Sequence, residues 1–171
     1  MKEFRLLTES EIEVKVKKVT EKGAILLLYK TARTDMDLLD EHFGAENWEC
    51  DYREVKGNLY CGIGVTLGDR QVWKWDCGIE SREDDEGNQK KGEASDAFKR
   101  AGFKWGIGRE LYTAPFIFVP ADKMRIQDGR KTFDTFRVEK IAYAGRAISG
   151  LSIINNGTGN RCWWWTAGGA K

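Results

Sequence analysis

Three runs of alternating apolar residues constrain the fold of this chain most strongly. The apolar positions are Trp48, Cys50 and Tyr52 in the first run, Leu59, Cys61, Ile63, Val65 and Leu67 in the second, and Trp73, Trp75, Cys77 and Ile79 in the third. Successive side chains of a β-strand point to opposite faces, so each run predicts a strand with one apolar face. Lys56-Gly57-Asn58 and Gly68-Asp69 separate the runs and are typical turn sequences. The pattern predicts a three-stranded β-meander whose apolar face needs a cover.

A helix over Gly92–Trp105 is the expected cover. Its apolar residues recur at helical spacing and form one stripe, made of Ala94, Ala97, Phe98, Ala101 and Trp105. Gly106-Ile107-Gly108 is placed to end the helix. The acidic stretch Ser81–Gln89, between the meander and this helix, is expected to be a solvated loop.

The two ends of the chain predict further elements. Alternation of Ile12, Val14 and Val16, followed by the apolar run Ala24–Tyr29, predicts a β-hairpin. Thr34 and Asp37 have the spacing of a helix capping box, and Met36, Leu39 and Phe43 predict a short helix that ends at Gly44. Pro115 and Pro120 enclose a short edge strand, and the segments Phe136–Tyr143, Ala147–Ile154 and Cys162–Thr166 read as three more strands.

These elements predict an α+β fold. Its centre is an antiparallel β-meander covered by a long basic helix (a β-β-β-α core), with an N-terminal hairpin and helix and extra C-terminal strands. A length of 171 residues suits a single domain over residues 1–171. Within it we expect a core over 11–119, C-terminal strands over 120–166 and a flexible tail over 167–171.

Charge is distributed unevenly along the chain. The formal net charge is only +1. Five acids and one arginine occupy Glu80–Glu86, whereas Lys90–Lys140 holds twelve basic and seven acidic residues. A nearly neutral protein can thus carry a basic stripe, and such stripes bind nucleic acid.

The helix Gly92–Trp105 and its flanks carry the main nucleic-acid signal. The candidate phosphate contacts are Lys90, Lys91, Lys99, Arg100, Lys104 and Arg109. Phe103 interrupts the polar face, where an aromatic ring can stack on a base or enter a subunit contact. The simpler alternative is an ordinary solvated helix face.

Other candidate features are weaker. Gly106-Ile107-Gly108-Arg109 would let the backbone approach a phosphate, although a helix C-cap is the simpler explanation. Lys30 and Arg33 flank the start of the first helix, where an anion is favoured, and could also be plain surface charges. Trp73 and Trp75 could stack bases or fill the core. Trp163-Trp164-Trp165 cannot all face one way in a strand, so at least one faces outward or meets a neighbouring subunit.

The sequence lacks the usual signatures of enzymes. It holds neither a Walker-type phosphate loop nor G-x-S-x-G, and its four cysteines form no C-x-x-C pair and its one histidine is His42. We therefore expect no enzymatic activity, no cofactor and no metal. The longest apolar run, Ala24–Tyr29, is too short to span a membrane, and the N-terminus has no signal core, so we expect a cytoplasmic protein that does not associate with membranes.

Two separated blocks resemble the Rad52/Rad22 superfamily of single-strand annealing proteins. The stretch Lys91–Tyr112 resembles the signature helix of the superfamily, closest to small phage and prophage members. The second block, Tyr29, Arg33, Phe43-Gly44 and Asn47-Trp48, is similar in spacing to the hairpin-to-helix segment of those proteins. The resemblance covers roughly residues 11–119, which it makes an annealing core.

The resemblance implies a function and a site. Members of the superfamily form rings or helical arcs that hold single-stranded DNA in an outer basic groove and anneal strands without ATP. Lys99 and Arg100 match the basic pair of that groove, and Arg33 matches a nearby basic position. Phe103 stands where eukaryotic members carry an arginine, and Lys104 is expected to supply that charge. A phage protein of this kind implies recombination and double-strand break repair in the cytoplasm of a bacterial host, with a phage exonuclease and a single-strand binding protein as partners.

Two other functions remain open from the residues. A passive single-strand binder would depend on Trp73 and Trp75 rather than on Lys99 and Arg100. A metal-dependent nuclease would need clustered carboxylates near a lysine, for which the chain offers the triplets Glu13-Val14-Lys15 and Glu54-Val55-Lys56.

Overall fold

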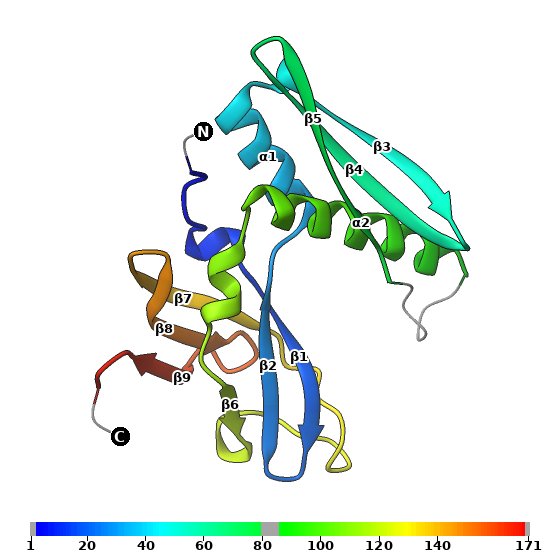
Figure 1. The fold of residues 1–171 in the computed structure, drawn as a ribbon. Coiled ribbons are helices and arrows are strands. Elements are labelled where there is room, and N and C mark those ends of the chain that lie inside the picture. Colours follow the sequence, from blue (N-terminus) through cyan, green and yellow to red (C-terminus); the bar gives the residue numbers. More distant parts are fainter. Residues whose placement is uncertain (1–2, 80–85, 170–171) are drawn as a thin grey trace. The chain divides into compact units, whose positions relative to one another are not determined.

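The computed structural model describes residues 3–79 and 86–169 and divides the chain into two compact units (Figure 1). The first unit comprises Met1–Arg5 and Lys30–Gly108, and the second comprises Leu6–Tyr29 and Arg109–Lys171. Helices and mostly antiparallel sheets together make the protein α+β, as predicted. The expected assignment of 11–119 as one core within a single domain stays a prediction, and we describe each unit by itself.

The predicted meander forms the sheet of the first unit. Strands β3 (Trp48–Val55), β4 (Asn58–Leu67) and β5 (Arg70–Cys77) pair antiparallel in the order β3-β4-β5. Lys56 and Gly57 connect β3 to β4 with φ angles of 54° and 76°. Two consecutive positive φ angles are typical of the tight turns that match the twist of a hairpin.

Helix α2 (Glu86–Trp105) covers one face of this meander (Figure 1). Four residues of its predicted apolar stripe are buried, namely Ala97, Phe98, Ala101 and Trp105, and they face the buried residues Cys61, Ile63 and Val65 of β4. Trp105 also donates from its indole nitrogen to the Ile63 carbonyl oxygen at 3.0 Å. Complete burial of a side chain such as Phe98 stabilises the fold by roughly 1.5–3 kcal/mol. The apolar layer thus joins α2 to β4, but the third run does not take part in it as predicted: β5 turns Lys74 and Asp76 toward α2 and its tryptophans, Trp73 and Trp75, to the other face.

Helix α2 begins earlier than the sequence pattern indicated. We predicted Gly92 as its first residue and a loop over Ser81–Gln89, whereas the helix starts at Glu86. Residues 86–89 are thus helical and 80–85, which hold most of the acidic run, lie outside the described residues. An acidic residue is favourable in the first turn of a helix, a signal that we had assigned to the loop.

The first helix, α1 (Ala32–Phe43), also begins earlier than predicted. Its N-cap is Thr31, whose hydroxyl oxygen accepts a hydrogen bond from the Thr34 amide at 3.1 Å. We had predicted Thr34 as the cap because the acid that normally completes a capping box lies three residues after it. Gly44 ends the helix as predicted, with a φ of 85° that favours glycine.

The second unit is a six-stranded antiparallel sheet in the order β6-β2-β1-β7-β8-β9. Its strands are β1 (Glu13–Thr20), β2 (Gly23–Tyr29), β6 (Ile117–Pro120), β7 (Phe136–Ala144), β8 (Ala147–Asn155) and β9 (Arg161–Thr166). The predicted hairpin, edge strand and C-terminal strands all occur. The N-terminal hairpin joins the C-terminal strands through the pairing of β1 with β7. The two edge strands, β6 and β9, also approach each other, so the sheet curls around its core.

Short 3-10 helices connect these elements. They are η1 (Glu9–Glu11), η2 (Ala45–Asn47), η3 (Arg109–Thr113) and η4 (Ala121–Lys123). The expected tail over 167–171 is described only to residue 169. Within the described residues, no helix is both long and apolar enough to cross a membrane.

The cysteines and the tryptophan run follow the strand pattern. All four cysteines are free thiols, with Cys61 and Cys162 buried and Cys50 exposed. Trp164 is 65% exposed on β9, whereas Trp163 and Trp165 are half-buried. The prediction that one tryptophan of the run faces outward is thus confirmed, and a subunit contact at Trp164 stays a prediction.

Candidate nucleic-acid interface

Two acidic residues of α2, Glu93 and Asp96, bind backbone amides of the first unit. Glu93 is 9% exposed, and its carboxylate accepts a hydrogen bond from the Leu59 amide at 3.0 Å. Asp96 accepts one from the Ile79 amide at 3.1 Å. These carboxylates satisfy backbone donors at the ends of β4 and β5, which would otherwise lack partners. The carboxylates of Glu93 and Asp96 therefore point toward the meander.

Asp76 on β5 orients two basic side chains of α2. Its two carboxylate oxygens lie 3.5 Å from Nε of Arg100 and 3.6 Å from Nζ of Lys104. The side chains of Arg100 and Lys104 remain 43% and 47% exposed, so these ion pairs contribute little to stability. Their effect is positional, because they hold two cations one helical turn apart, about 6 Å along the axis. We call Lys99, Arg100 and Lys104 the α2 ridge.

Lys74 adds a further cation beside the C-terminal end of α2. Its ammonium donates to the Lys104 carbonyl oxygen at 3.0 Å and lies 4.4 Å from the centre of the Trp105 ring. A cation is favoured at the carbonyl end of a helix. Neither Lys74 nor Asp76 was among the contacts predicted from the sequence. The alternation of β5 carried the signal, because it turns both residues toward α2 and turns Trp73 and Trp75 away.

Lys30 is buried in the first unit and binds the backbone of Lys99. Its ammonium is bound to both carboxylate oxygens of Asp35, at 2.6 Å for Oδ1, and it donates to the Lys99 carbonyl oxygen at 3.2 Å. Lys30 is 8% exposed and Asp35 is 0% exposed. The structure thus gives Lys30 a positioning role, and the direct DNA contact that we expected of it stays a prediction.

Burial sets the electrostatics of this pair. It raises the pKa of Asp35 to about 6, and the Lys30 ammonium acts in the opposite direction. Lys99 also lowers the pKa of Asp35, which places the positive charge of the ridge within electrostatic reach of α1.

Close contact between α1 and α2 depends on Gly102. A Cβ atom at this position would lie 2.5 Å from Oδ2 of Asp35. Glycine is helix-disfavouring, so its presence in the middle of α2 is explained by this approach. The sequence signal was a glycine within an otherwise regular helical pattern.

The other predicted contacts are spread over both units. Lys90 and Lys91 are exposed on α2, Phe103 is half-buried one residue before Lys104, and Arg33 is exposed in the first turn of α1. Arg109 is exposed at the start of η3 and belongs to the second unit. The first unit thus brings Lys99, Arg100 and Lys104 together on one helix, with Lys90 and Lys91 nearer its start.

The glycines after α2 serve as a helix cap. Gly106 has a φ of 113°, and its amide donates to the Gly102 carbonyl oxygen at 3.2 Å. The next amide, that of Ile107, donates to the same oxygen at 3.1 Å. These bonds satisfy helical carbonyls that would otherwise end without partners. The C-cap interpretation of the G-x-G sequence accounts for this geometry.

On the opposite face of the meander, two indole rings stack against each other. Trp73 and Trp75 lie over Gly64 and Gly62 of β4, with ring centres 5.6 Å apart. The Arg53 guanidinium sits 4.5 Å from the Trp75 ring centre and pairs with Asp51 at 2.9 Å. Glu49 and Asp51 share this face with Arg53, so its charge is mixed and not uniformly positive as a phosphate-binding surface requires.

The sequence that builds this site matches a known protein family. Residues 5–130 match the Rad52/22 family of double-strand break repair proteins, and this range is more than half of the chain. The chain belongs to the Rad52/22 family. The matched range includes the meander, α2 and the hairpin of the second unit, and it ends before β7. No match was found among curated proteins or among solved structures.

Membership of the Rad52/22 family agrees with the resemblance seen in the sequence. Both cover the α2 ridge, with the family match extending from residue 5 to residue 130. Among the described residues, no three His, Cys, Asp or Glu side chains gather closely enough to hold a metal ion.

Proposed function

We propose that the protein binds single-stranded DNA and anneals complementary strands without ATP, in recombination and double-strand break repair. Two observations support the proposal. The chain belongs to a family of double-strand break repair proteins. Glu93 and Asp96 turn toward the meander and leave Lys99, Arg100 and Lys104 as a ridge of positive charge, and this ridge carries the proposal.

The proposed mechanism rests on neutralisation of phosphate charge and involves no bond making or breaking by the protein. Complementary strands repel one another through their phosphates, and a basic ridge neutralises one strand while counterions leave it. Phosphates carry no sequence, so binding tolerates any sequence. Base pairing supplies the free energy of annealing, and the protein acts as no enzyme and needs no cofactor.

The proposed contacts have different roles. Arg100 and Lys104 bind phosphates in the orientation that Asp76 sets, and Lys99 adds a third charge. Phe103 stacks on a base or enters a subunit contact. The remaining proposed contacts, which extend the path of the strand or support it, are Lys90, Lys91, Arg33, Lys30 and Arg109.

The family resemblance extends the proposal to assembly and context. We propose that copies of the chain form a ring or helical arc, so that many weak contacts act on one strand at once. The protein is proposed to be a phage type that acts in the cytoplasm of a bacterial host, together with a phage exonuclease and a single-strand binding protein.

Annealing of two labelled complementary oligonucleotides tests the function. The assay omits ATP and is run with and without EDTA. Acceleration that survives EDTA supports the proposal. Binding without acceleration indicates a passive single-strand binder, and strand cleavage that requires a divalent metal indicates a nuclease.

The site is tested by the double variant Lys99→Ala with Arg100→Ala. We expect at least about tenfold weaker binding of single-stranded DNA at low salt, because two phosphate contacts are lost. A matched control replaces Lys56 and Lys140, two exposed lysines on other elements, with alanine. Unchanged affinity in a folded Lys99/Arg100 variant, or an equal loss in the control, contradicts the assignment.

A further inference from the structure

We propose that copies of the chain associate through a knob and a hollow that both lie in the second unit. The knob is the side chain of Phe133, in the loop before β7. The hollow lies on the outer face of β7, β8 and β9, beside Trp164. Phe133 of one copy enters the hollow of the next copy. The inference rests on the proposed function only for the statement that the partner is a second copy.

Two rows of paired residues shape the hollow. The rows cross β7, β8 and β9 and consist of Lys140, Ser152 and Trp164, and of Ala142, Gly150 and Thr166. Directly paired residues of antiparallel strands share a face of the sheet. Gly150 has no side chain and Ala142 has only a methyl group, so the second row is low beside the Trp164 ring. The resulting hollow has a volume of about 570 Å³.

Trp164 forms the apolar wall of the hollow. Its side chain is 65% exposed, although the indole ring is among the largest apolar groups in a protein. An exposed ring of this size gains nothing from water and offers a flat surface on which a second aromatic ring packs. The wall therefore favours an aromatic side chain as the occupant of the hollow.

The charges in the hollow nearly cancel. Lys140 of β7 and Glu9 of η1 contribute opposite charges to its lining. The Arg161 guanidinium, also in the lining, donates to both carboxylate oxygens of Glu139, at 2.6 and 2.9 Å. A phosphate backbone requires an excess of positive charge. The hollow therefore suits an uncharged apolar group rather than a nucleic acid.

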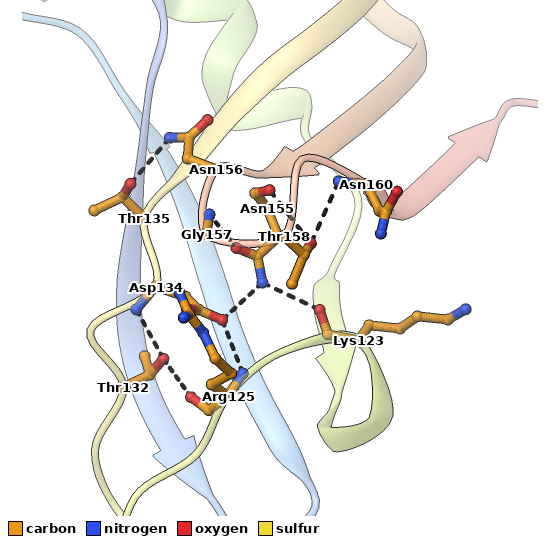
Figure 2. A network of polar contacts seen from close by, with 10 residues as sticks. All are labelled: Lys123, Arg125, Thr132, Asp134, Thr135, Asn155, Asn156, Gly157, Thr158 and Asn160. Carbon is orange, nitrogen blue, oxygen red and sulfur yellow. Dashed lines mark hydrogen bonds and ion pairs between the residues drawn. The ribbon is translucent and has the colours of Figure 1, made fainter.

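A buried polar network fixes the backbone on both sides of Phe133 (Figure 2). Phe133 itself is 79% exposed, whereas Asp134 is 5% exposed. Asp134 accepts hydrogen bonds from the Arg125 amide and the Asn155 side chain, at 2.8 and 2.7 Å. The Thr132 hydroxyl donates to the Arg125 carbonyl oxygen at 2.7 Å and accepts from the Asp134 amide at 3.1 Å. A rigid backbone thus presents the ring, so little conformational freedom is lost when the ring is bound.

The knob cannot reach the hollow of its own chain. Phe133 precedes β7, whereas Ala142 lies six residues after Phe136, the first residue of that strand. A strand rises about 3.3 Å per residue, so the hollow is roughly 20 Å from the start of β7. This separation is far greater than the length of a phenylalanine side chain. Contact between knob and hollow therefore requires a second copy.

The contact is head-to-tail, because the knob and the hollow are different surfaces. Such a contact leaves one free knob and one free hollow on every pair of copies. It therefore repeats from copy to copy and produces a ring or a helical arc. Phe133, Gly150 and Trp164 all follow residue 130, where the match to the Rad52/22 family ends. The contact is thus an inference about this chain and not a consequence of its family.

The charges beside the two surfaces are complementary. Arg130 and Lys131 are exposed and precede Phe133 in its loop. Glu9 and Glu11 belong to η1, which borders the hollow through Glu9. Opposite charges around an apolar contact speed the encounter and favour one orientation. This complementarity favours a second copy as the occupant of the hollow.

Two variants each remove one half of the contact. Phe133→Glu removes the knob, and Trp164→Glu places a charge in the wall of the hollow. Both side chains are exposed, so we expect both variants to fold. The matched control is Phe116→Glu, at another exposed phenylalanine of the second unit. Sedimentation velocity of the DNA-free full chains measures their mass. We expect the parent and the control to associate and each of the two variants to sediment as a monomer.

An equimolar mixture of the two variants is the decisive measurement. The Phe133→Glu copy keeps its hollow and the Trp164→Glu copy keeps its knob, so one contact forms and it cannot repeat. We therefore expect the mixture to sediment as a dimer, although each variant alone is a monomer. A mixture that stays monomeric overturns the proposal, because the variants then act by unfolding or through another surface.

The other outcomes separate this contact from DNA binding. Association of either variant alone like that of the parent, or a parent that is monomeric at every concentration, overturns the contact whatever the affinity for DNA. The Lys99→Ala, Arg100→Ala variant is expected to associate as the parent does, because the α2 ridge takes no part in the contact. A parent that associates through the contact but binds no single-stranded DNA overturns the proposed function and supports the contact.

Discussion

The Lys30 ammonium lies 2.6 Å from Oδ1 of Asp35, in a site where the lysine is 8% exposed and the aspartate 0% exposed. The same ammonium donates to the Lys99 carbonyl oxygen. One buried ion pair therefore links the first turn of α1 to the backbone of the α2 ridge. Removing one partner leaves an unpaired charge in the interior, which costs far more than the pair contributes.

The first prediction follows from this asymmetry. Asp35→Asn is expected to lower the free energy of unfolding by about 3–5 kcal/mol, because the Lys30 ammonium loses its counter-charge. The double variant Lys30→Met with Asp35→Leu is expected to recover most of that loss. Urea denaturation of the three proteins measures both changes. Equal destabilisation by the single and double variants contradicts the prediction.

The same double variant tests the role of Lys30 in binding. If Lys30 acts by position, the folded double variant binds single-stranded DNA within about twofold of the parent. A tenfold loss in a variant of normal stability restores the direct contact that the sequence suggested, because a single lost phosphate contact has an effect of about this order.

Two glycines of α2 give the second prediction. Gly102→Ala is expected to destabilise the protein by about 1–3 kcal/mol, since its Cβ would lie 2.5 Å from Oδ2 of Asp35. Gly92→Ala meets nothing within 4 Å and is expected to stabilise by about 0.5–1 kcal/mol through helix propensity. Thermal unfolding compares the two. Shifts in the same direction for both variants contradict the prediction.

The third prediction concerns the acid beside the ridge. Asp76→Asn keeps the size of the side chain and removes its charge, which lies near Arg100 and Lys104. A phosphate about 7 Å away then escapes a repulsion of roughly 0.6 kcal/mol in water, or about threefold in affinity. We expect tighter single-strand binding at low salt and no difference at about 1 M salt, where charges are screened. Weaker binding at low salt indicates that orientation by Asp76 matters more than its charge.

The strands of both units could be predicted because their alternation is a local property of the chain. The apolar stripe of α2 was equally local, and Ala97, Phe98 and Ala101 are buried as predicted. Helix starts were less accurate, because Thr31 and Thr34 both suit an N-cap and only the fold selects between them. Pairings between strands far apart in the sequence could not be predicted, because alternation says nothing about which strand is the neighbour. One example is the position of the N-terminal hairpin between β6 and β7.

The candidate site was predictable in part for the same reason. Helical spacing places Arg100 and Lys104 on one ridge, but spacing carries no information about Asp76, which comes from another strand. Lys30 shows the opposite case. A lysine in a sequence indicates an exposed charge by default, and only the tertiary position of Asp35 shows that this one is buried.

The last prediction is a pH dependence that arises in the second unit. Burial raises the pKa of Asp134, but hydrogen bonds from the Arg125 amide, Asn155 and the Arg125 side chain outweigh it, so the pKa lies below its ordinary 3.8. A carboxyl group whose pKa is lowered by folding contributes stability that is present above the ordinary value and is lost as the pH falls through the folded value. Asp134→Asn is therefore expected to lower the free energy of unfolding by about 1–3 kcal/mol at pH 7, and the difference from the parent is expected to shrink below about pH 4.

Asp128→Asn is the matched control in the same loop, because that residue is exposed and asparagine tolerates its φ of 50°. Urea denaturation between pH 3 and 7 measures the three proteins. A constant difference between the parent and Asp134→Asn across this range would mean that the charge of Asp134 does not stabilise the fold, and that shape alone holds the loop that precedes β7 (Figure 2).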